Sequence, residues 1–351
     1  MLSVGLVGLP NAGKSTLFNL LTKRQVPAEN FPFCTIEPNA GIVEVPDLRI
    51  KKISEICQSE KEIYAAIEFM DIAGLVKNAS SGAGLGNQFL SHIREVDLIL
   101  LVVRTFENDN VIHVENRVNP KEDEEILLLE LMLSDEQMME KMIPRMQKDA
   151  KTSKDRLSAE KMGIAEKILE GLKNMKPAST FVLEKNTDKD LLKWRKGLNL
   201  LTDKPILKLA NVSQDGINQV YQSDFDLDIL LESSVSDMSI EERIELGMEG
   251  ETGLDKMIKA CYHKLNLATF LTGGPKEARA WTFDAGMTAP QCAGKIHSDF
   301  EKTFIKAEVI SFTDYVESSG WKGAVEKGKM RSEGKEYIMQ DGDVVEFRVG
   351  V

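Results

Sequence analysis

The segment GLPNAGKS at residues 8–15 constrains the fold of this chain more than any other part of its sequence. It matches the pattern GxxxxGKS, follows a short apolar run and leads into the helix-forming stretch TLFN at 16–19. In such a loop the glycines let backbone N–H groups converge on phosphates, and the N-terminal end of the helix adds its positive dipole. The motif therefore predicts a strand, a phosphate-binding loop and a helix in a parallel α/β sheet.

The side chains of this loop point to a nucleoside triphosphate bound with magnesium. Lys14 is expected to neutralise the β- and γ-phosphates and to act in catalysis, and the Ser15 hydroxyl is expected to bind Mg2+. Thr16 is expected to contact the α-phosphate. The residues of this region that we expect to bind the nucleotide are Asn11, Ala12, Gly13, Lys14, Ser15 and Thr16.

A second motif, DIAG at 71–74, ends an apolar run and supplies the next part of the predicted site. Ligands bind at the carboxyl ends of strands in open parallel sheets. We expect Asp71 to hold magnesium through a water and the Gly74 N–H to meet the γ-phosphate as part of the catalytic machinery.

Two further segments resemble switch loops. In NFPFCTIEPN at 30–39, Thr35 is the candidate second magnesium ligand, by analogy with loops that order around a γ-phosphate. A plain surface loop is the alternative for that segment. SGAGLGN at 81–87 is interpreted as a mobile second switch with glycine hinges.

Short apolar, β-branched runs alternate with helical patterns, which predicts a doubly wound sheet covered on both faces. The predicted strands are Ser3 to Gly8, Ala65 to Asp71, Asp97 to Arg104, Pro205 to Asn211 and Asp228 to Ser233. One connection, from Phe106 to Pro205, spans about 99 residues, whereas a crossover needs only about 10 to 12. A domain is therefore inserted there.

The insertion, at 123–200, is rich in Glu, Lys, Leu and Met and is predicted to form two long antiparallel helices. Its methionines are expected to line the seam between the helices, with a promiscuous binding surface as the alternative. They are Met132, Met138, Met139, Met142 and Met146.

The C-terminal part differs in composition and is predicted to be a small α+β domain. Ala280 to Phe283 and Val344 to Val349 are predicted strands, Ala289 to Phe304 a helix, and Asp341-Gly342 a tight turn. The predicted domains are thus a nucleotide-binding domain of 1–122 and 201–266, a helical insertion of 123–200, and a C-terminal domain of 267–351.

Composition limits the other classes of function. Apolar residues make up 42% and charged residues 28% of the 351, the balance of a globular protein, and the net charge of −12 argues against coating nucleic acid along its length. No DNA partner is expected. No stretch of about 18 apolar residues and no signal peptide is visible, so we expect no membrane partner and a cytoplasmic location. The isolated cysteines, Cys34, Cys57, Cys261 and Cys292, are expected to be buried structural thiols.

Taken together, these segments resemble the YchF family, also called Obg-like ATPases, in the TRAFAC class of P-loop GTPases. The resemblance extends over nearly the whole chain, through NFPFCTIEPN, DIAGLVKNASSGAGLGNQFLSHIREVD, RAWTF, TAPQCAGKIHSDFEKTFIKAEVISF and EGKEYIMQDGDVVEFRV. It implies a nucleotide domain, a coiled-coil insertion and a C-terminal TGS domain of β-grasp form. It also implies ATP hydrolysis and association with ribosomes.

Two positions bear on mechanism within this resemblance. Leu75 stands where many relatives carry a water-orienting glutamine, and an aliphatic side chain cannot polarise water, so slow intrinsic turnover is expected. The alternative is that the Leu75 side chain only packs against its neighbours. Asn11 resembles the asparagine that binds an activating potassium ion in some relatives, although it could also brace the loop.

The base-reading segment departs from guanine-specific relatives, whose NKxD aspartate accepts two hydrogen bonds from guanine. Here the corresponding strand end reads NVSQ at 211–214, and the family pattern is closer to NxxE. An amide at Gln214 suits the N6 amine and N1 of adenine, with Asn211 on the N7 and N6 edge and the backbone of Val212 supporting the ring. ATP is therefore expected to bind more tightly than GTP, unless NVSQ is only a strand exit.

The sequence is compatible with three functions: an ATPase switch linked to ribosomes, a guanine-specific GTPase, and an RNA-binding adaptor in which the nucleotide is mainly structural. The evidence for RNA is local, because Lys141 to Lys161 holds seven basic and three acidic residues. Lys141, Arg145 and Lys148 share one helical face, although a solvated helix surface explains such a run equally well. In the C-terminal domain, contacts would depend on a few residues such as Lys295, His297 and Lys302, with an interior role as the alternative for His297.

Overall fold

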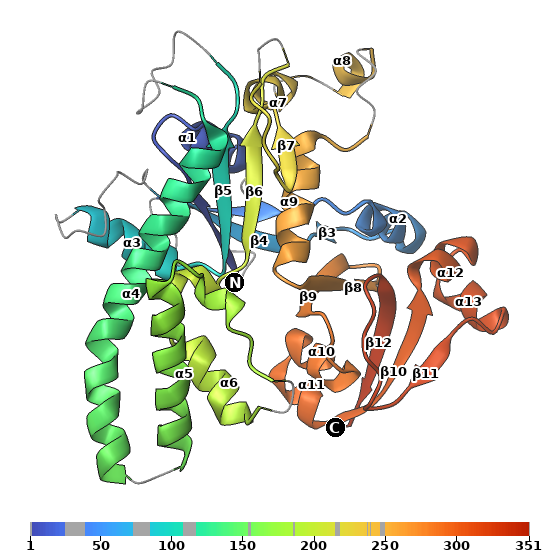
Figure 1. Ribbon diagram of the computed structural model, residues 1–351. Helices are drawn as coiled ribbons and strands as arrows, with labels where there is room; N and C mark the ends of the chain where they lie inside the picture. Colours follow the sequence, from blue (N-terminus) through green and yellow to red (C-terminus); the bar gives the residue numbers. More distant parts are fainter. Residues whose placement is uncertain are drawn as a thin grey trace. The chain divides into compact units, whose positions relative to one another are not determined.

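The computed structural model describes residues 2–24, 39–72, 85–107, 117–153, 156–184, 187–214, 218–236, 238, 240–245 and 250–350. Within them, contacts divide the chain into two compact units, drawn in Figure 1. The first unit holds the described parts of 2–23, 39–41 and 69–253, and the second those of 24, 42–68 and 254–350. Thr35, Gly74 and Leu75 lie outside the described residues, as does Cys34.

A six-stranded sheet carries the phosphate-binding loop. In sheet order its strands are β2 (Ala40–Glu44), β4 (Ala66–Asp71), β1 (Ser3–Val7), β5 (Leu98–Arg104), β6 (Ile206–Asn211) and β7 (Phe225–Leu227). Neighbours among β1, β5, β6 and β7 pair in parallel, and every residue of β5 is buried. Among the helices of this unit, α1 (Lys14–Thr22) follows β1, α3 (Leu85–Glu95) follows β4 and α7 (Ile229–Ser236) follows β7, with α8 (Ile240–Glu245) after α7. The predicted doubly wound α/β fold is confirmed.

The prediction of a strand over Asp228 to Ser233 is wrong. Its apolar residues begin helix α7, because the Asp228 carboxylate accepts the Leu231 N–H at 2.9 Å and caps the first turn. The edge strand β7 lies just before it. An aspartate followed by the apolar run Ile229 to Leu231 thus marked a helix start that resembles a short buried strand in the sequence.

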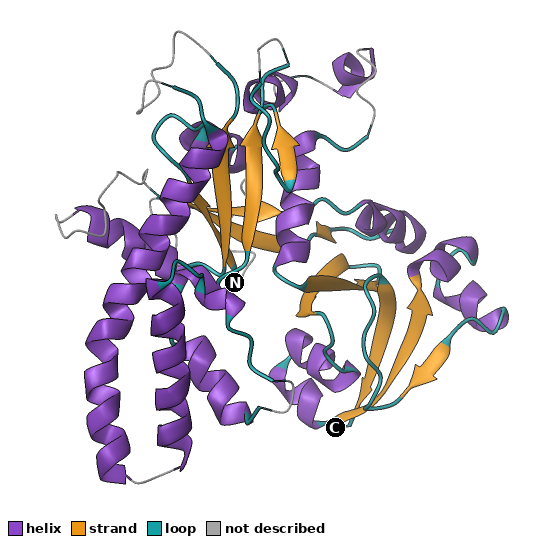
Figure 2. Cartoon of the chain, viewed as in Figure 1, coloured by secondary structure: helices purple, strands orange, loops and turns teal. Residues whose placement is uncertain are grey.

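The predicted pair of long helices is confirmed, and Figure 2 shows them side by side. They are α4 (Pro120–Ser153) and α5 (Arg156–Lys173), followed by α6 (Lys189–Gly197). Met132 and Met139 are buried between them, and Met138, Met142 and Met146 are partly buried against the same cluster. The methionines therefore form the seam, as the sequence predicted.

The second unit contains a β-grasp sheet, which confirms the predicted C-terminal fold. Its strands, in sheet order, are β11 (Arg331–Glu333), β10 (Phe304–Ser311), β12 (Asp343–Val349), β8 (Leu267–Gly273), β9 (Ala278–Asp284) and β3 (Glu62–Ile63). Its helices are α2 (Leu48–Cys57), α9 (Gly253–Lys264), α10 (Ala289–Ile296), α11 (Ser298–Lys302), α12 (Phe312–Glu317) and α13 (Trp321–Glu326).

The single helix predicted over Ala289 to Phe304 is in fact two, interrupted at His297. The backbone at His297 is extended, and its Nδ1 accepts the Asp299 N–H at 3.3 Å to cap α11. The His297 side chain is 60% exposed, so the interior role considered for it is also wrong. Lys295 and Lys302 are exposed with it.

Part of the N-terminal third of the chain packs within the second unit. The strand β3 pairs in parallel with β9, and a Cβ at Gly273 of β8 would lie 2.5 Å from Ile53 Cγ2 of α2. Arg49 of α2 forms an ion pair with Asp341 at 2.7 Å, and Cys57 Sγ lies 3.1 Å from Tyr315 Oη. The grouping by contacts therefore differs from the boundaries drawn on the sequence. Cys261 and Cys292 are buried, as expected, whereas Cys57 is only half-buried.

Candidate nucleotide-binding site

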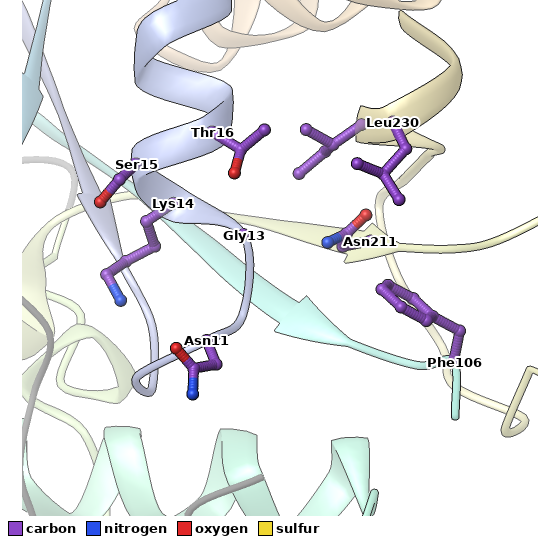
Figure 3. A pocket seen from close by; sticks show the side chains of 9 residues that line it. Asn11, Gly13, Lys14, Ser15, Thr16, Phe106, Asn211 and Leu230 are labelled. Atoms are coloured by element: carbon purple, nitrogen blue, oxygen red, sulfur yellow. The ribbon is translucent and has the colours of Figure 1, made fainter. Parts of the chain in front are cut away.

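A pocket of about 270 Å³ opens where β1, β5 and β6 end, around the start of α1. Figure 3 shows its side chains, with the loop and the head of α1 on one side and residues from the ends of β5, β6 and the start of α7 on the other. The lining residues are Asn11, Gly13, Lys14, Ser15, Thr16, Phe106, Asn211, Ile229 and Leu230. The loop residues Gly13 to Thr16 and the residue Asn211, which lie far apart in the sequence, thus line the same cavity.

Lys14 is held beneath the loop in a desolvated position. Only 6% of the residue is exposed, and its Nζ donates to the Leu9 carbonyl at 2.9 Å. Burial lowers the pKa of Lys14 to about 8, and the nearby Asp71 carboxylate partly opposes that shift. An ammonium with so little water around it gains strongly from a polyanion, because its charge is poorly solvated otherwise.

Gly13 and Asn211 show why the loop needs a glycine at this position. Gly13 has φ 105°, and a Cβ there would lie 2.5 Å from Asn211 Nδ2. The same amide nitrogen donates to the Ala12 carbonyl at 3.0 Å. Asn211, which is 5% exposed, therefore braces the phosphate loop from the end of β6 as well as lining the pocket.

The residues expected to bind magnesium suit a hard cation where they are described. Asp71 Oδ1 is buried and, within the described part of the chain, has no hydrogen-bond partner. A buried carboxylate oxygen without a donor is costly unless a cation or its water satisfies it. Ser15 lines the pocket and offers its hydroxyl oxygen as a ligand, whereas Asp71 is not among the residues that line it. Thr35 lies outside the described residues, so its predicted role as a ligand is not addressed by this geometry.

The pocket wall that faces the loop is apolar, and its residues were not among those predicted from the sequence. Phe106 lies two residues beyond β5, while Ile229 and Leu230 begin α7. Leu230 is 60% exposed although it is a large apolar residue. The signal that could have found Phe106 is its position directly after the carboxyl end of a central strand, where ligands of parallel sheets bind.

Three residues expected to bind the nucleotide do not line the pocket: Ala12, Val212 and Gln214. Ala12 is buried and contributes its carbonyl to Asn211. The Gln214 residue is exposed, and its backbone N–H donates to Asp228 Oδ2 at 2.9 Å. Most of the residues expected to bind phosphate thus line the pocket, whereas Asn211 alone of the three expected to bind the base does so.

Comparison with known proteins settles which family has this site. A family profile described as a 50S ribosome-binding GTPase matches residues 3–139, and one described as YchF-GTPase C, a protein of unknown function, matches residues 267–350. A Bacillus subtilis protein named ribosome-binding ATPase YchF is 46% identical over 370 residues, covering 100% of both chains. The chain belongs to the YchF family.

Other YchF proteins agree along the whole length. The ribosome-binding ATPase YchF of Escherichia coli O157:H7 is 47% identical over 364 residues, covering 99% of each chain. The structure of the Schizosaccharomyces pombe YchF GTPase matches with a TM-score of 0.83 at 33% identity, covering 99% of this chain and 97% of that one. The YchF architecture of P-loop domain, helical region and C-terminal domain is therefore the architecture of this chain. None of the helices described in it is long and apolar enough to cross a membrane.

Proposed function

We propose that this YchF protein is a magnesium-dependent ATPase that acts in the cytoplasm as a nucleotide-controlled switch on ribosomes. The observation that carries the proposal is the single pocket that combines Lys14, Ser15 and Thr16 with an apolar wall at Phe106 and Leu230. The names of the relatives from Bacillus subtilis and Escherichia coli, ribosome-binding ATPase YchF, support both the reaction and the partner.

Binding of the triphosphate is assigned to the loop and the head of α1. Backbone N–H groups and Lys14 would neutralise the phosphates, while Ser15 and Thr35 would be the magnesium ligands and Asp71 would hold the ion through a water. Bound there, the metal ion would offset charge that develops on the phosphoryl oxygens during transfer. Gly74 would donate its N–H to the γ-phosphate. With Leu75 in place of a glutamine, this chain lacks the usual group that orients water, and slow turnover without a partner follows.

The residues in and next to the pocket support a preference for ATP over GTP. Neither an aspartate nor a lysine occupies the positions that guanine-specific relatives use, since the segment reads NVSQ at 211–214. The Asn211 side chain lies in the pocket, and Phe106 and Leu230 provide apolar surface for a purine ring. Because Gln214 is exposed, its contact to the base would require movement of its side chain toward the ligand.

A potassium requirement is a further part of the proposal. Asn11 lines the pocket in a left-handed conformation with φ 63°, next to the place where phosphate would bind. Replacing potassium with sodium at constant ionic strength should then lower turnover. Unchanged turnover would leave Asn11 with only the role of supporting the loop.

One experiment tests the reaction and the partner together. ATP and GTP are titrated separately against the purified protein, with and without ribosomes, and affinity and phosphate release are measured in each case. We expect tighter binding of ATP and faster hydrolysis with ribosomes. GTP binding at least tenfold tighter than ATP would return the chain to the guanine-specific GTPases. Turnover that ribosomes leave unchanged would weaken the switch.

A further inference from the structure

Two walls of the base pocket come from different strands, and a small polar network holds them together. Phe106 extends from β5, whereas Asn211 ends β6 and leads into the segment 211–214. Thr105, just before Phe106, is 1% exposed and donates its N–H to the Asn211 carbonyl at 3.1 Å. The Thr105 hydroxyl lies 3.0 Å from the same carbonyl.

Asn218 closes this network from the other side. Its Nδ2 donates to the Ser213 carbonyl at 2.7 Å, and its Oδ1 accepts the Ser213 N–H at 3.0 Å. The same Oδ1 lies 3.3 Å from the Thr105 hydroxyl, whose single proton is shared between it and the Asn211 carbonyl. Asn218 also forms an isolated bridge with Phe106, and the Gln219 N–H donates to the Thr105 carbonyl at 2.7 Å.

The Asn218 side chain is not part of the hydrophobic core. It is exposed in a loop, yet its side chain bonds to residues next to the pocket, twice to Ser213 and once to Thr105. Through Ser213 it fixes the segment after Asn211, and through Thr105 it fixes the backbone before Phe106. Asn218 therefore adds side-chain contacts to the Thr105–Asn211 hydrogen bonds that already hold the base-reading segment beside the end of β5.

We propose that Asn218 is a positioning residue that sets nucleotide base selectivity, by clasping the segment 211–214 to the end of β5. The inference rests on the proposed function, because it takes the base to lie between Phe106 and Leu230. A preorganised slot discriminates between bases because the wrong base leaves fixed polar groups unpaired. When the clasp is lost, the segment can adjust to either base, so affinity and discrimination fall together while phosphate binding remains.

The test uses Asn218→Ala in the full chain, measured by steady-state kinetics with ATP and GTP and by inhibition with inorganic triphosphate, which has no base. We expect the KM for ATP to rise about fivefold to tenfold, the scale of one or two lost hydrogen bonds. The kcat and the inhibition constant of triphosphate should stay within twofold. The ratio of kcat/KM for the two nucleotides should move toward one.

Two further variants separate positioning from general disturbance. Thr105→Val removes the hydroxyl and should act in the same direction, whereas Thr105→Ser keeps it and should preserve the wild-type ratio. The matched control is Gln219→Ala, because the Gln219 side chain in the same loop donates to Glu107 instead, at 3.2 Å. The control should change none of these constants.

The outcomes distinguish this inference from the proposed function. A wild-type preference for GTP would refute the proposed function, but a collapse of that preference in Asn218→Ala would still support the clasp. If wild type shows no preference between ATP and GTP, Asn218 sets no selectivity and the inference is overturned. Unchanged KM and ratio in Asn218→Ala, or equal weakening of ATP and triphosphate, would overturn it.

Discussion

The Arg94 guanidinium and the Asp135 carboxylate form a 3.0 Å ion pair that joins the end of α3 to the middle of α4. Asp135 is fully buried and also accepts the backbone N–H groups of Leu201 and Thr202, at 3.0 and 2.8 Å, and the Thr202 hydroxyl at 2.8 Å. Arg94 donates in addition to Ser134 Oγ at 3.0 Å. One carboxylate thus connects helix α3, the long helix α4 and the segment that returns from the helical insertion.

Replacement of that carboxylate should be among the most destabilising single changes in the first unit. Asp135→Ala would leave Arg94 without its ionic partner and two backbone donors unsatisfied, so we expect a loss of about 3 to 5 kcal/mol in unfolding free energy. Urea denaturation followed by circular dichroism measures it. Glu140→Ala is the matched control, because its pair with Lys173 is 49% exposed on both sides and should contribute little to stability. Similar losses in the two variants would contradict the assignment.

The aromatic wall of the pocket predicts a specific loss of base binding. Phe106→Ala should weaken ATP binding about tenfold, since stacking and apolar contact are worth about 1 to 2 kcal/mol. Inorganic triphosphate should bind as in wild type, and Phe106→Tyr should retain most of the ATP affinity. Calorimetric titration gives both constants. Equal weakening of the two ligands would show that Phe106 supports the phosphate loop rather than the base.

The exposed basic face of α4 predicts a ribosome contact. Lys141, Arg145 and Lys148 are all exposed, so reversing these three charges should lower co-sedimentation with ribosomes and leave ATP affinity unchanged. Reversal of Lys189, Lys193 and Lys196, which are exposed on α6, changes the net charge equally and serves as control. Co-sedimentation of the α4 variant equal to wild type at low and moderate salt would count against the contact. An equal drop in both variants would assign the effect to net charge.

Glu308 predicts acid sensitivity in the second unit. Hydrogen bonds from Lys306 and Arg348 lower the pKa of this carboxyl, which outweighs the opposing effect of burial. A carboxyl whose pKa is lower when folded stabilises the protein above its unfolded pKa, and that contribution is lost as pH falls through the folded value. Unfolding free energy should therefore be lower at about pH 3, below the ordinary glutamate pKa of 4.5, than at neutral pH. The drop should be smaller in Glu308→Gln, when denaturation is measured at both pH values. An identical pH dependence would refute this role.

What the sequence predicts well are features that a local pattern fully specifies. Continuous apolar runs identified β1, β4, β5 and β6, because a central parallel strand is buried on both faces. The GKS motif placed α1 because the loop and helix form one phosphate-binding unit. The methionine seam followed from the helix-forming composition of the insertion and from the tendency of methionine to fill apolar gaps.

The features it missed depend on contacts between distant segments. Phe106 and Leu230 look like ordinary core residues until the fold brings them opposite the loop. Asn218 is an unremarkable polar loop residue in the sequence, and only its hydrogen bonds to Ser213 and Thr105 reveal a role. Likewise, nothing local to α2 indicates that Ile53 packs against Gly273.

The packing of α2 and β3 against the β-grasp strands bears on how such a domain could be transplanted. A C-terminal fragment that began after residue 266 would lack Ile53, Arg49 and β3. These three lie more than 200 residues earlier in the chain than the residues that they contact. The C-terminal domain therefore cannot be exchanged with that of a relative by joining the two sequences at a single position. A chimera with a relative should fold well only if residues 42–68 are exchanged together with the C-terminal strands.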